Sequence, residues 1–287
     1  MQSVRSILVV LQPEHAQGWS LDRATLIAGV TGARLHLFVH DKHSDHRSRL
    51  ALLSRQLDEQ GYENVTSQQS STGTLPEAII QAQQAYGCDL VIKEHHPDQP
   101  LVKALLTPED WKLLRLCPCA VLMVKSGKPW AGGVVLAAVD IGNDDEDHRA
   151  LHASIIDTGY DAATLIRGQL HVVSAHPSPT LPGPDPAYQV STDHLEHYAD
   201  ACRTFQRVHD ISDERMHMAA GAADAVIPAV EQAHAAVLTI VGTIGRTGLS
   251  GALIGNTAEV VLDALQCDVL VLKSEEAAAH LARLSKS

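Results

Sequence analysis

The chain has 287 residues, about twice the roughly 150 residues of an average domain, which predicts two domains. Its net charge of −12 is uneven, because residues 1–131 hold 13 basic and 13 acidic residues and residues 132–287 hold 9 and 21. An acidic half argues against nucleic-acid binding and against docking on anionic lipid, since both need a basic face. No apolar run approaches the roughly 20 residues of a membrane span, and the N-terminus has no signal-peptide cleavage site. Five cysteines without paired spacing indicate reduced thiols, so we expect a cytoplasmic protein that binds neither nucleic acid nor membrane.

The first half alternates apolar strands with amphipathic helices. We predict strands at residues 6–12, 34–39, 88–93 and 119–125, and a weaker one at 65–70. Helices are predicted at residues 21–31, with Ser20 as N-cap, and at 75–85 after Thr74. A further helix begins at Thr107, with proline in its first turn followed by two acidic residues.

The second half repeats this order. The four strong strands recur at residues 134–140, 169–174, 237–242 and 267–273, at offsets of 128, 135, 149 and 148, and a weaker strand recurs at 215–219. Helices are expected at residues 146–163 and 187–209. The strands are near-continuous apolar runs, which is typical of parallel strands buried on both faces. We expect two tandem α/β domains, 1–129 and 130–287, joined by the short Gly- and Pro-rich stretch 126–133.

A second loop, residues 176–186, contains five prolines. We interpret it as a stiff surface connection. The alternative is a lid over a site, because it follows the carboxyl end of a strand, where α/β folds bind their ligands.

A glycine-rich stretch, residues 241–259, lies between a strand and a helix. Gly242, Gly245 and Gly255 form the pattern G-x2-G-x9-G, and Asn256 and Thr257 follow. Glycines let the backbone approach phosphate oxygens, and the N–H groups of the helix start attract an anion. Arg246 can pair with a phosphate, and Asn256 can cap the helix with Glu259 returning the bond. A glycine-rich turn without a ligand is the alternative.

This pattern, late in a five-stranded α/β domain, resembles the nucleotide-binding motif of the universal stress proteins, and the whole chain resembles their tandem type. The strongest match is GTIGRTGLSGALIGNTAEVVLDALQCDVLVLK, and TPEDWKLLRLCPCAVLMVK in the first half also resembles that type. The resemblance implies two flavodoxin-like domains with strand order 3-2-1-4-5 that pair through their last strands, in a cytoplasmic protein.

The resemblance also implies a nucleotide site in the second half. In ATP-binding members an aspartate ending the first strand contacts the nucleoside, and Asp140 has that place. A backbone amide and carbonyl after a Leu-His pair hold the adenine, which points to Val172. The phosphate loop matches Gly242, Gly245, Gly255, Asn256 and Thr257, with Asn256 replacing the usual Ser or Thr.

The first half does not match this pattern. Gln12 stands where Asp140 does, Lys93 and His96 stand at Gly242 and Gly245, and Thr107 stands near Gly255. The acidic residues after Thr107 would repel a phosphate. We therefore expect that the first half does not bind ATP in the family's manner, which leaves another small ligand open.

Other candidate chemistry is weaker. Histidines and acids at residues 40–46 and the pair His95-His96 follow neighbouring strands, but their spacing matches no known zinc motif, so we expect solvated loop residues and no metal site. His36 and His171 are predicted to be hydrogen-bonded residues inside strands. Cys117 and Cys119 lack CxxC spacing, and Cys119 is expected to be a buried structural thiol.

The sequence therefore favours a stress-response protein that binds ATP, with Mg²⁺ assisting, and that is not an enzyme. A slow ATPase or phosphotransferase is the second hypothesis, with Asp140 as the one evident candidate base. A ligand-free structural dimerisation module is the third. Whether the chain satisfies its own pairing surface or forms a homodimer stays open.

Overall fold

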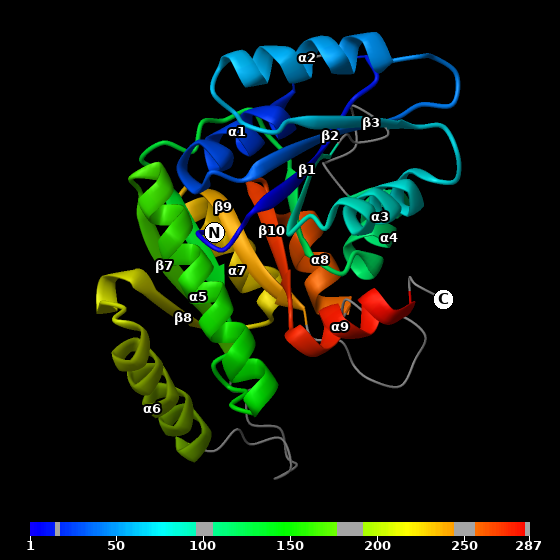
Figure 1. The fold of residues 1–287 in the computed structure, drawn as a ribbon. Coiled ribbons are helices and arrows are strands. Elements are labelled where there is room, and N and C mark those ends of the chain that lie inside the picture. The colour runs from blue at the N-terminus through cyan, green and yellow to red at the C-terminus, as the bar shows by residue number, and fades with distance from the viewer. Residues whose placement is uncertain (15–17, 96–105, 177–191, 244–255, 285–287) are drawn as a thin grey trace.

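The computed structural model describes residues 1–14, 18–95, 106–176, 192–243 and 256–284. Its strands form one sheet in the order β3-β2-β1-β4-β5-β10-β9-β6-β7-β8 (Figure 1). Read outward from its last strand, each half has the order 5-4-1-2-3, so both halves have the topology that the family resemblance implies. The bounds in the first half are β1 (Ser6–Leu11), α1 (Trp19–Thr31), β2 (Arg34–His40), α2 (Arg47–Glu59), β3 (Thr66–Ser70), α3 (Leu75–Tyr86), β4 (Leu90–Glu94), α4 (Pro108–Leu116) and β5 (Ala120–Val124).

The second half repeats these elements and adds a helix at its end. The bounds are β6 (Val134–Ala138), α5 (Glu146–Ile166), β7 (Gln169–His176), α6 (Thr192–His209), the 3-10 turn η2 (Asp213–Arg215), β8 (Met216–Ala220), α7 (Ala223–Ala233), β9 (Ala236–Thr243), α8 (Asn256–Ala264), β10 (Asp268–Lys273) and α9 (Glu275–Leu284). None of the described helices is long and apolar enough to cross a membrane.

Helices cover both faces of the sheet. Residues of α1, α2 and α5 pack on one face, and residues of α3, α4, α7 and α8 pack on the other. Residues of the inner strands are buried almost throughout, as in β1, where all six are buried, because these strands are covered on both sides. The edge strands β3 and β8, which the sequence predicts as the weaker ones, are half-buried or exposed. Each of the two core clusters contains residues from both halves, so the apolar core is continuous across the chain.

Two features of the helix starts can be compared with the sequence. The prediction of Ser20 as an N-cap is wrong, because α1 begins at Trp19 with Gly18 as N-cap, and the Ser20 hydroxyl donates to the Val10 carbonyl at 3.0 Å. The predicted start of α4 is confirmed. Thr107 Oγ1 accepts from the Asp110 N–H at 3.2 Å, and the Asp110 carboxylate accepts from the Thr107 N–H at 3.0 Å.

The two halves meet where β5 and β10 pair in antiparallel fashion, with Leu122 opposite Leu270. Lysines that end these strands cross the junction in both directions. Lys125 Nζ donates to the carbonyls of Leu262 and Leu265 at 2.6 and 2.9 Å, and Lys273 Nζ donates to the carbonyl of Leu114. The two lysines are equivalent in the repeat, so each half caps the end of a helix in the other.

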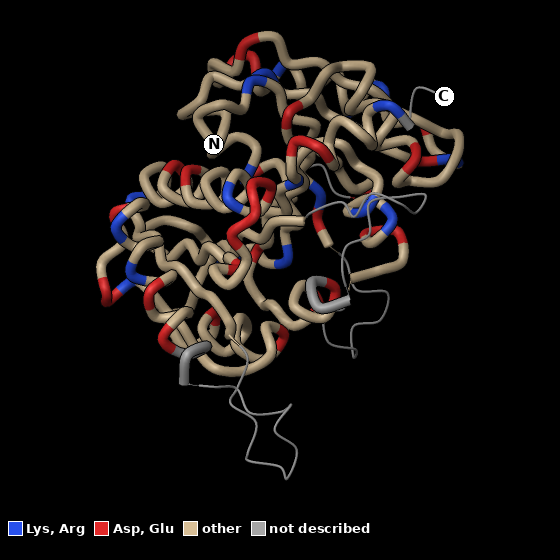
Figure 2. Tube along the Cα trace, turned by 90° about the horizontal axis from the view of Figure 1, so that it is seen from below, with Lys and Arg blue, Asp and Glu red and all other residues tan. Residues whose placement is uncertain are grey.

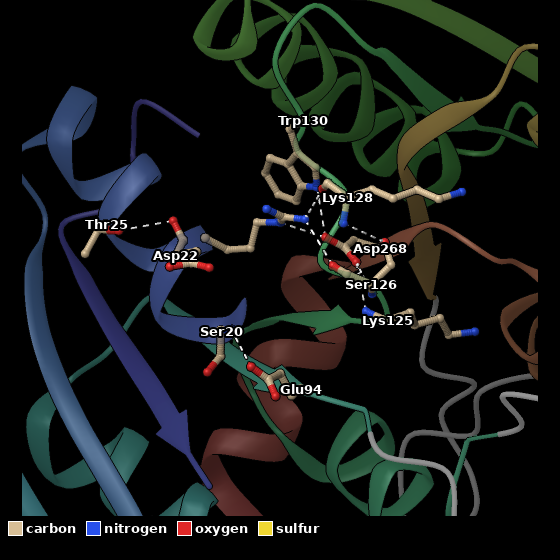
Figure 3. Close-up of polar contacts among 10 residues, drawn as sticks. Ser20, Asp22, Thr25, Glu94, Lys125, Ser126, Lys128, Trp130 and Asp268 are labelled. Atoms are coloured by element: carbon tan, nitrogen blue, oxygen red, sulfur yellow. Dashed lines mark hydrogen bonds and ion pairs between the residues drawn. The ribbon is translucent and has the colours of Figure 1, made fainter. Parts of the chain in front are cut away.

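A buried carboxylate adds a contact at this junction that only one half supplies (Figure 3). Asp268 is fully buried and accepts at 2.8 Å from Arg23 Nε, from Trp130 Nε1 and from the Lys125 N–H. The Ser126 N–H donates to the same carboxylate at 3.2 Å. We call Asp268 and these partners the junction cluster. The equivalent residue of the first half is Ala120, so the cluster has no symmetric copy.

Arg23 belongs to the first half and Trp130 to the connection, so the junction cluster fixes the linker against both halves. The Arg23 guanidinium also lies over the Trp130 ring, 4.8 Å from its centroid. All five cysteines are free thiols, as the sequence predicts. Cys119, which was expected to be buried, is only half-buried, and its sulfur lies 3.6 Å from that of the buried Cys117. Acidic and basic residues are interspersed along the described parts of both halves (Figure 2).

Candidate functional site

Asp140 lies at the carboxyl edge of the second half, just after β6 and between β7 and β9. The residue is exposed, but its backbone is held in place. Its N–H donates to His152 Nε2 at 3.2 Å, and its carbonyl accepts from the Asn143 N–H at 3.1 Å. Burial lowers the pKa of His152 to about 4, so its ring stays neutral and keeps the lone pair that this bond needs. A carboxylate therefore stands at a fixed point of the edge.

Gly242 lies in β9 beside this position and packs against α5. A Cβ atom at Gly242 would lie 2.6 Å from Leu151 Cδ2 and 2.8 Å from Ile155 Cδ1. Packing alone therefore requires glycine at this residue, whether or not a ligand binds. This structural role cannot be distinguished from a ligand-binding role in the sequence.

Two aromatic rings lie near the loop that follows Asp140. A Cβ atom at Gly142 would lie 2.5 Å from Tyr198 of α6, so the tyrosine ring packs directly on the loop backbone. The His176 ring, at the end of β7, lies 5.6 Å from the Tyr198 ring between centroids. These two side chains were not predicted, and their sequence signal is weak because α6 reaches the edge only through the fold.

Val172 lies inside β7 and is fully buried, with Ala137 and Met216 as register partners. The register continues with Ala138 opposite Val173, which puts Val172 three residues before the level of Asp140. At the edge itself, Ser174 Oγ accepts from the Ile141 N–H at 3.3 Å. The adenine contact assigned to Val172 stays a prediction.

The glycine loop is largely outside the described residues. Gly245, Arg246 and Gly255 fall in that part of the chain, and Asn256 and Thr257 are the first residues of α8. Because α8 begins at Asn256, that residue lies within the helix. The carboxylate of Glu259, expected to bond back to Asn256, forms an ion pair with Arg115 of the first half.

The corresponding edge of the first half is occupied by its own side chains. Glu94, the last residue of β4, is buried, and its Oε1 accepts from the Ser20 N–H at 3.0 Å, at the start of α1 (Figure 3). A Cβ atom at Gly18, the N-cap of α1, would lie 2.4 Å from the same oxygen. The carboxylate thus takes the place that an anion would have at this helix start.

A second buried group lies on the opposite face of β4. Lys93 Nζ lies 2.7 Å from one oxygen of Asp110, and His95 Nδ1 lies 2.9 Å from the other. Burial alone would raise the pKa of Asp110, but its bonds to His95, Lys93 and the Thr107 N–H hold it well below its usual range. This closed ion-pair network has no place for an added phosphate.

Comparison with known proteins identifies the fold family. The model of the family described as "Universal stress protein family" matches residues 7–125 and, a second time, residues 133–273. The chain belongs to the universal stress protein family. Its two copies account for the duplicated sheet, whereas the boundary at residue 129 stays a prediction.

Individual universal stress proteins resemble this chain over different shares of its length, and the chain matches less than two thirds of the length of the Escherichia coli relative. Universal stress protein E of Escherichia coli K12 is 36% identical over 208 residues, which cover 70% of this chain and 65% of that protein. Universal stress protein E of Photorhabdus laumondii is 29% identical over 96% of both chains. A crystal structure of a putative universal stress protein from Pseudomonas aeruginosa UCBPP-PA14 is 52% identical, with a TM-score of 0.92 over 100% of this chain and 99% of that one.

The strand registers correct one correspondence between the two universal stress domains. Val9 pairs with Ile92 in the first half, and its repeat equivalent Ala137 pairs with Ile240 in the second. Glu94, and not Lys93, is therefore the counterpart of Gly242. The sequence comparison was one residue out, and a slip of one residue moves every side chain to the other face of the strand. His96 lies outside the described residues.

Of the histidines considered in the sequence, His46 is more buried than expected, whereas His36 and His171 are hydrogen-bonded inside strands as predicted. In the segment 40–46, His46 Nε2 bonds to Asp41 Oδ2 at 2.7 Å, and Asp41 Oδ1 accepts from the His43 N–H. His36 is a hydrogen-bonded core residue, as predicted, at 2.7 Å from Thr66 Oγ1. Among the described residues, the histidines that approach one another at metal-ligand spacing are His171, His217 and His234.

Proposed function

We propose that the second universal stress domain binds an adenine nucleotide, ATP with Mg²⁺, and that this cytoplasmic protein uses the bound nucleotide to regulate its contacts with a partner in the stress response. The observation that carries the proposal is the contrast at one edge of the sheet. The second half presents an exposed carboxylate beside a glycine, and the first half fills the equivalent position with Glu94.

Each part of the edge suits one part of the ligand. The Asp140 carboxylate can accept bonds from ribose hydroxyls, and the rings of Tyr198 and His176 offer a surface for a base near the loop. Backbone N–H groups at the start of α8 are suited to binding phosphates, and the sequence before the helix supplies Gly245, Arg246 and Gly255. The Tyr198 contact depends on α6, so base recognition here would involve more than the Val172 backbone.

The net charge of −12 opposes the approach of a polyphosphate. We therefore expect modest affinity that depends on Mg²⁺. Affinity without Mg²⁺ that equals or exceeds affinity with it would contradict this charge argument.

The binding test is calorimetric titration of MgATP into the whole chain and three variants. Asp140→Asn and Gly245→Val should each weaken binding at least tenfold, which corresponds to about 1.4 kcal/mol. The matched control is Gln12→Ala, at the position of the first half equivalent to Asp140, which should bind as the parent does. Gly242 is unsuitable because its substitution disturbs packing. A Gly245→Val chain that binds ATP like the parent would refute the assignment.

The two alternatives have distinct outcomes. Sustained phosphate release from ATP that is lost in Asp140→Asn would favour a slow ATPase or phosphotransferase. A freshly purified protein that carries no nucleotide and binds none would favour a structural dimerisation module. Glu94 occupies this edge in the first half, so we propose that the first half does not bind ATP in the manner of the family, and that any ligand it does bind is a different one.

A further inference from the structure

Three histidines meet on the second half, away from the carboxyl edge. They come from three elements: His171 from β7, His217 from β8 and His234 from the residue that ends α7. One ring nitrogen from each lies within 4.8 Å of the others. We call these residues the histidine triad.

The fold explains why they meet. Val173 is the register partner of His217, so His171, Val173 and His217 lie on one face of the sheet, since side chains alternate along a strand. Helix α7 packs on that face, with Val226 and Ile227 in the same core cluster as Val173.

A sharp turn then brings the third histidine to the sheet. Ala235, between α7 and β9, has a left-handed backbone with φ of 48°, which is uncommon for a residue with a side chain. The His234 ring centroid consequently lies 4.2 Å from that of His217 and 4.9 Å from that of His171.

The distances suit a metal ion after a modest rearrangement, in which the His234 nitrogen, within 4.8 Å of the other two, would approach by up to about 1.4 Å. His171 Nδ1 and His217 Nε2 face each other at 2.9 Å. Two imidazole nitrogens bound to one tetrahedral zinc ion at about 2.0–2.1 Å stand roughly 3.4 Å apart. An ion between them would need these two rings to separate by only about half an ångström.

The chemistry of the rings is also suitable. An imidazole binds a metal through the lone pair of an unprotonated ring nitrogen. In the hydrogen bond between His171 Nδ1 and His217 Nε2, the accepting nitrogen already has such a lone pair directed at its neighbour.

We propose that the histidine triad binds one divalent transition-metal ion of the zinc type, with three imidazole ligands and the fourth position left to water. Imidazole suits zinc and its neighbours better than Mg²⁺ or Ca²⁺, which prefer oxygen ligands. The positive charge of Arg215 nearby limits the affinity. The alternative is a purely structural stack held by the bond between His171 and His217.

The site is independent of the proposed nucleotide site. His171 pairs with Leu136, four residues before Asp140, so a metal bound at the triad lies away from the Asp140 carboxylate and the helix start proposed for the phosphates, although Val172, the predicted adenine contact, is the next residue. Zinc binding and MgATP binding are measured separately, so either proposal can be contradicted while the other is supported.

Equilibrium dialysis against Zn²⁺ after EDTA treatment tests the site in the full chain. The parent should bind zinc at one ion per chain through the triad, and Co²⁺ in place of zinc should give the visible absorption of a four-coordinate ion. His234→Ala, at a half-buried helix end, should weaken this binding at least tenfold while MgATP binding stays as in the parent.

Two controls separate the triad from other histidines. His209→Ala, a half-buried histidine of α6, and His46→Ala, in the 40–46 segment, should both bind zinc like the parent. Zinc binding that survives His234→Ala, that is lost in His46→Ala, or that is absent from the parent would overturn the proposal. Circular dichroism of each variant checks that it is folded.

Discussion

The two halves place a carboxylate near the start of the helix that follows their first strand, but they take it from different elements. In the first half the N-cap is Gly18, and Glu94 of β4 supplies the carboxylate. In the second half the N-cap is Asp145, whose side chain accepts from the His148 N–H at 2.9 Å, and the strand residue is Gly242. At these equivalent positions, β4 of the first half therefore carries a charged side chain and β9 of the second half carries none. The two copies of the fold thus stabilise equivalent helix starts with carboxylates from different elements.

The largest expected effect tests the junction cluster, which only one half supplies. Asp268→Asn removes the charge that a buried Arg23 faces, so the free energy of unfolding should fall by about 3–5 kcal/mol. Urea-induced unfolding measures it. The control is Asp200→Asn, which breaks an exposed pair with Arg203 and should change the free energy by less than about 1 kcal/mol. Equal effects of both variants would show that the junction cluster does not hold the halves together.

A smaller effect tests the two strand ends. Gly242→Ala should lower the free energy of unfolding by about 1–3 kcal/mol, because the new methyl group meets Leu151 and Ile155. Gly29→Ala in helix α1 is the control, since the nearest atom to its Cβ is 3.8 Å away, and alanine should be neutral or stabilising there. A stable Gly242→Ala protein that loses MgATP would instead assign this glycine to the ligand.

The third test compares one buried histidine in each half through the pH dependence of the free energy of unfolding. Burial lowers the pKa of His36 and of His152 to about 4, against 6.5 in the unfolded chain. Between pH 6.5 and 4 the unfolded state binds protons that the native state does not. The free energy of unfolding should therefore fall on acidification by up to about 1.4 kcal/mol per pH unit for each histidine.

Urea unfolding between pH 7 and 5, in EDTA, measures this slope. His36→Gln and His152→Gln should each reduce it by close to one proton, and should do so within a single transition because the core is continuous across the halves. An unchanged slope in both variants would contradict the assignment.

The sequence predicted the strands well, because parallel strands buried on both faces, such as β1 and β10, are uninterrupted apolar runs. The same property made it impossible to predict the strand register. A run without alternation does not show which face a residue takes, so Lys93 was aligned where Glu94 lies. The assignment of Gly242 to the phosphate loop stays a prediction, and close packing on α5 gives a second reason for glycine at this residue.

The histidine triad could not be predicted at all. Its members are separated by 46 and 17 residues, and they meet through strand pairing and the turn at Ala235. Three histidines at such spacing look like unrelated residues until β7, β8 and α7 are placed side by side. Asp140, in contrast, was located by its position after a strand, which sequence alone shows.

The pairing of β5 with β10 has a consequence for how the protein behaves on dilution. Both strands belong to one polypeptide, and the short connection 125–133 joins the half that contains β5 to the half that contains β10, so each strand meets the other at a high effective concentration. A junction between separate subunits would dissociate as the protein is diluted, and its apparent stability would follow concentration. The junction between β5 and β10 is intramolecular, so dilution should not separate these two strands.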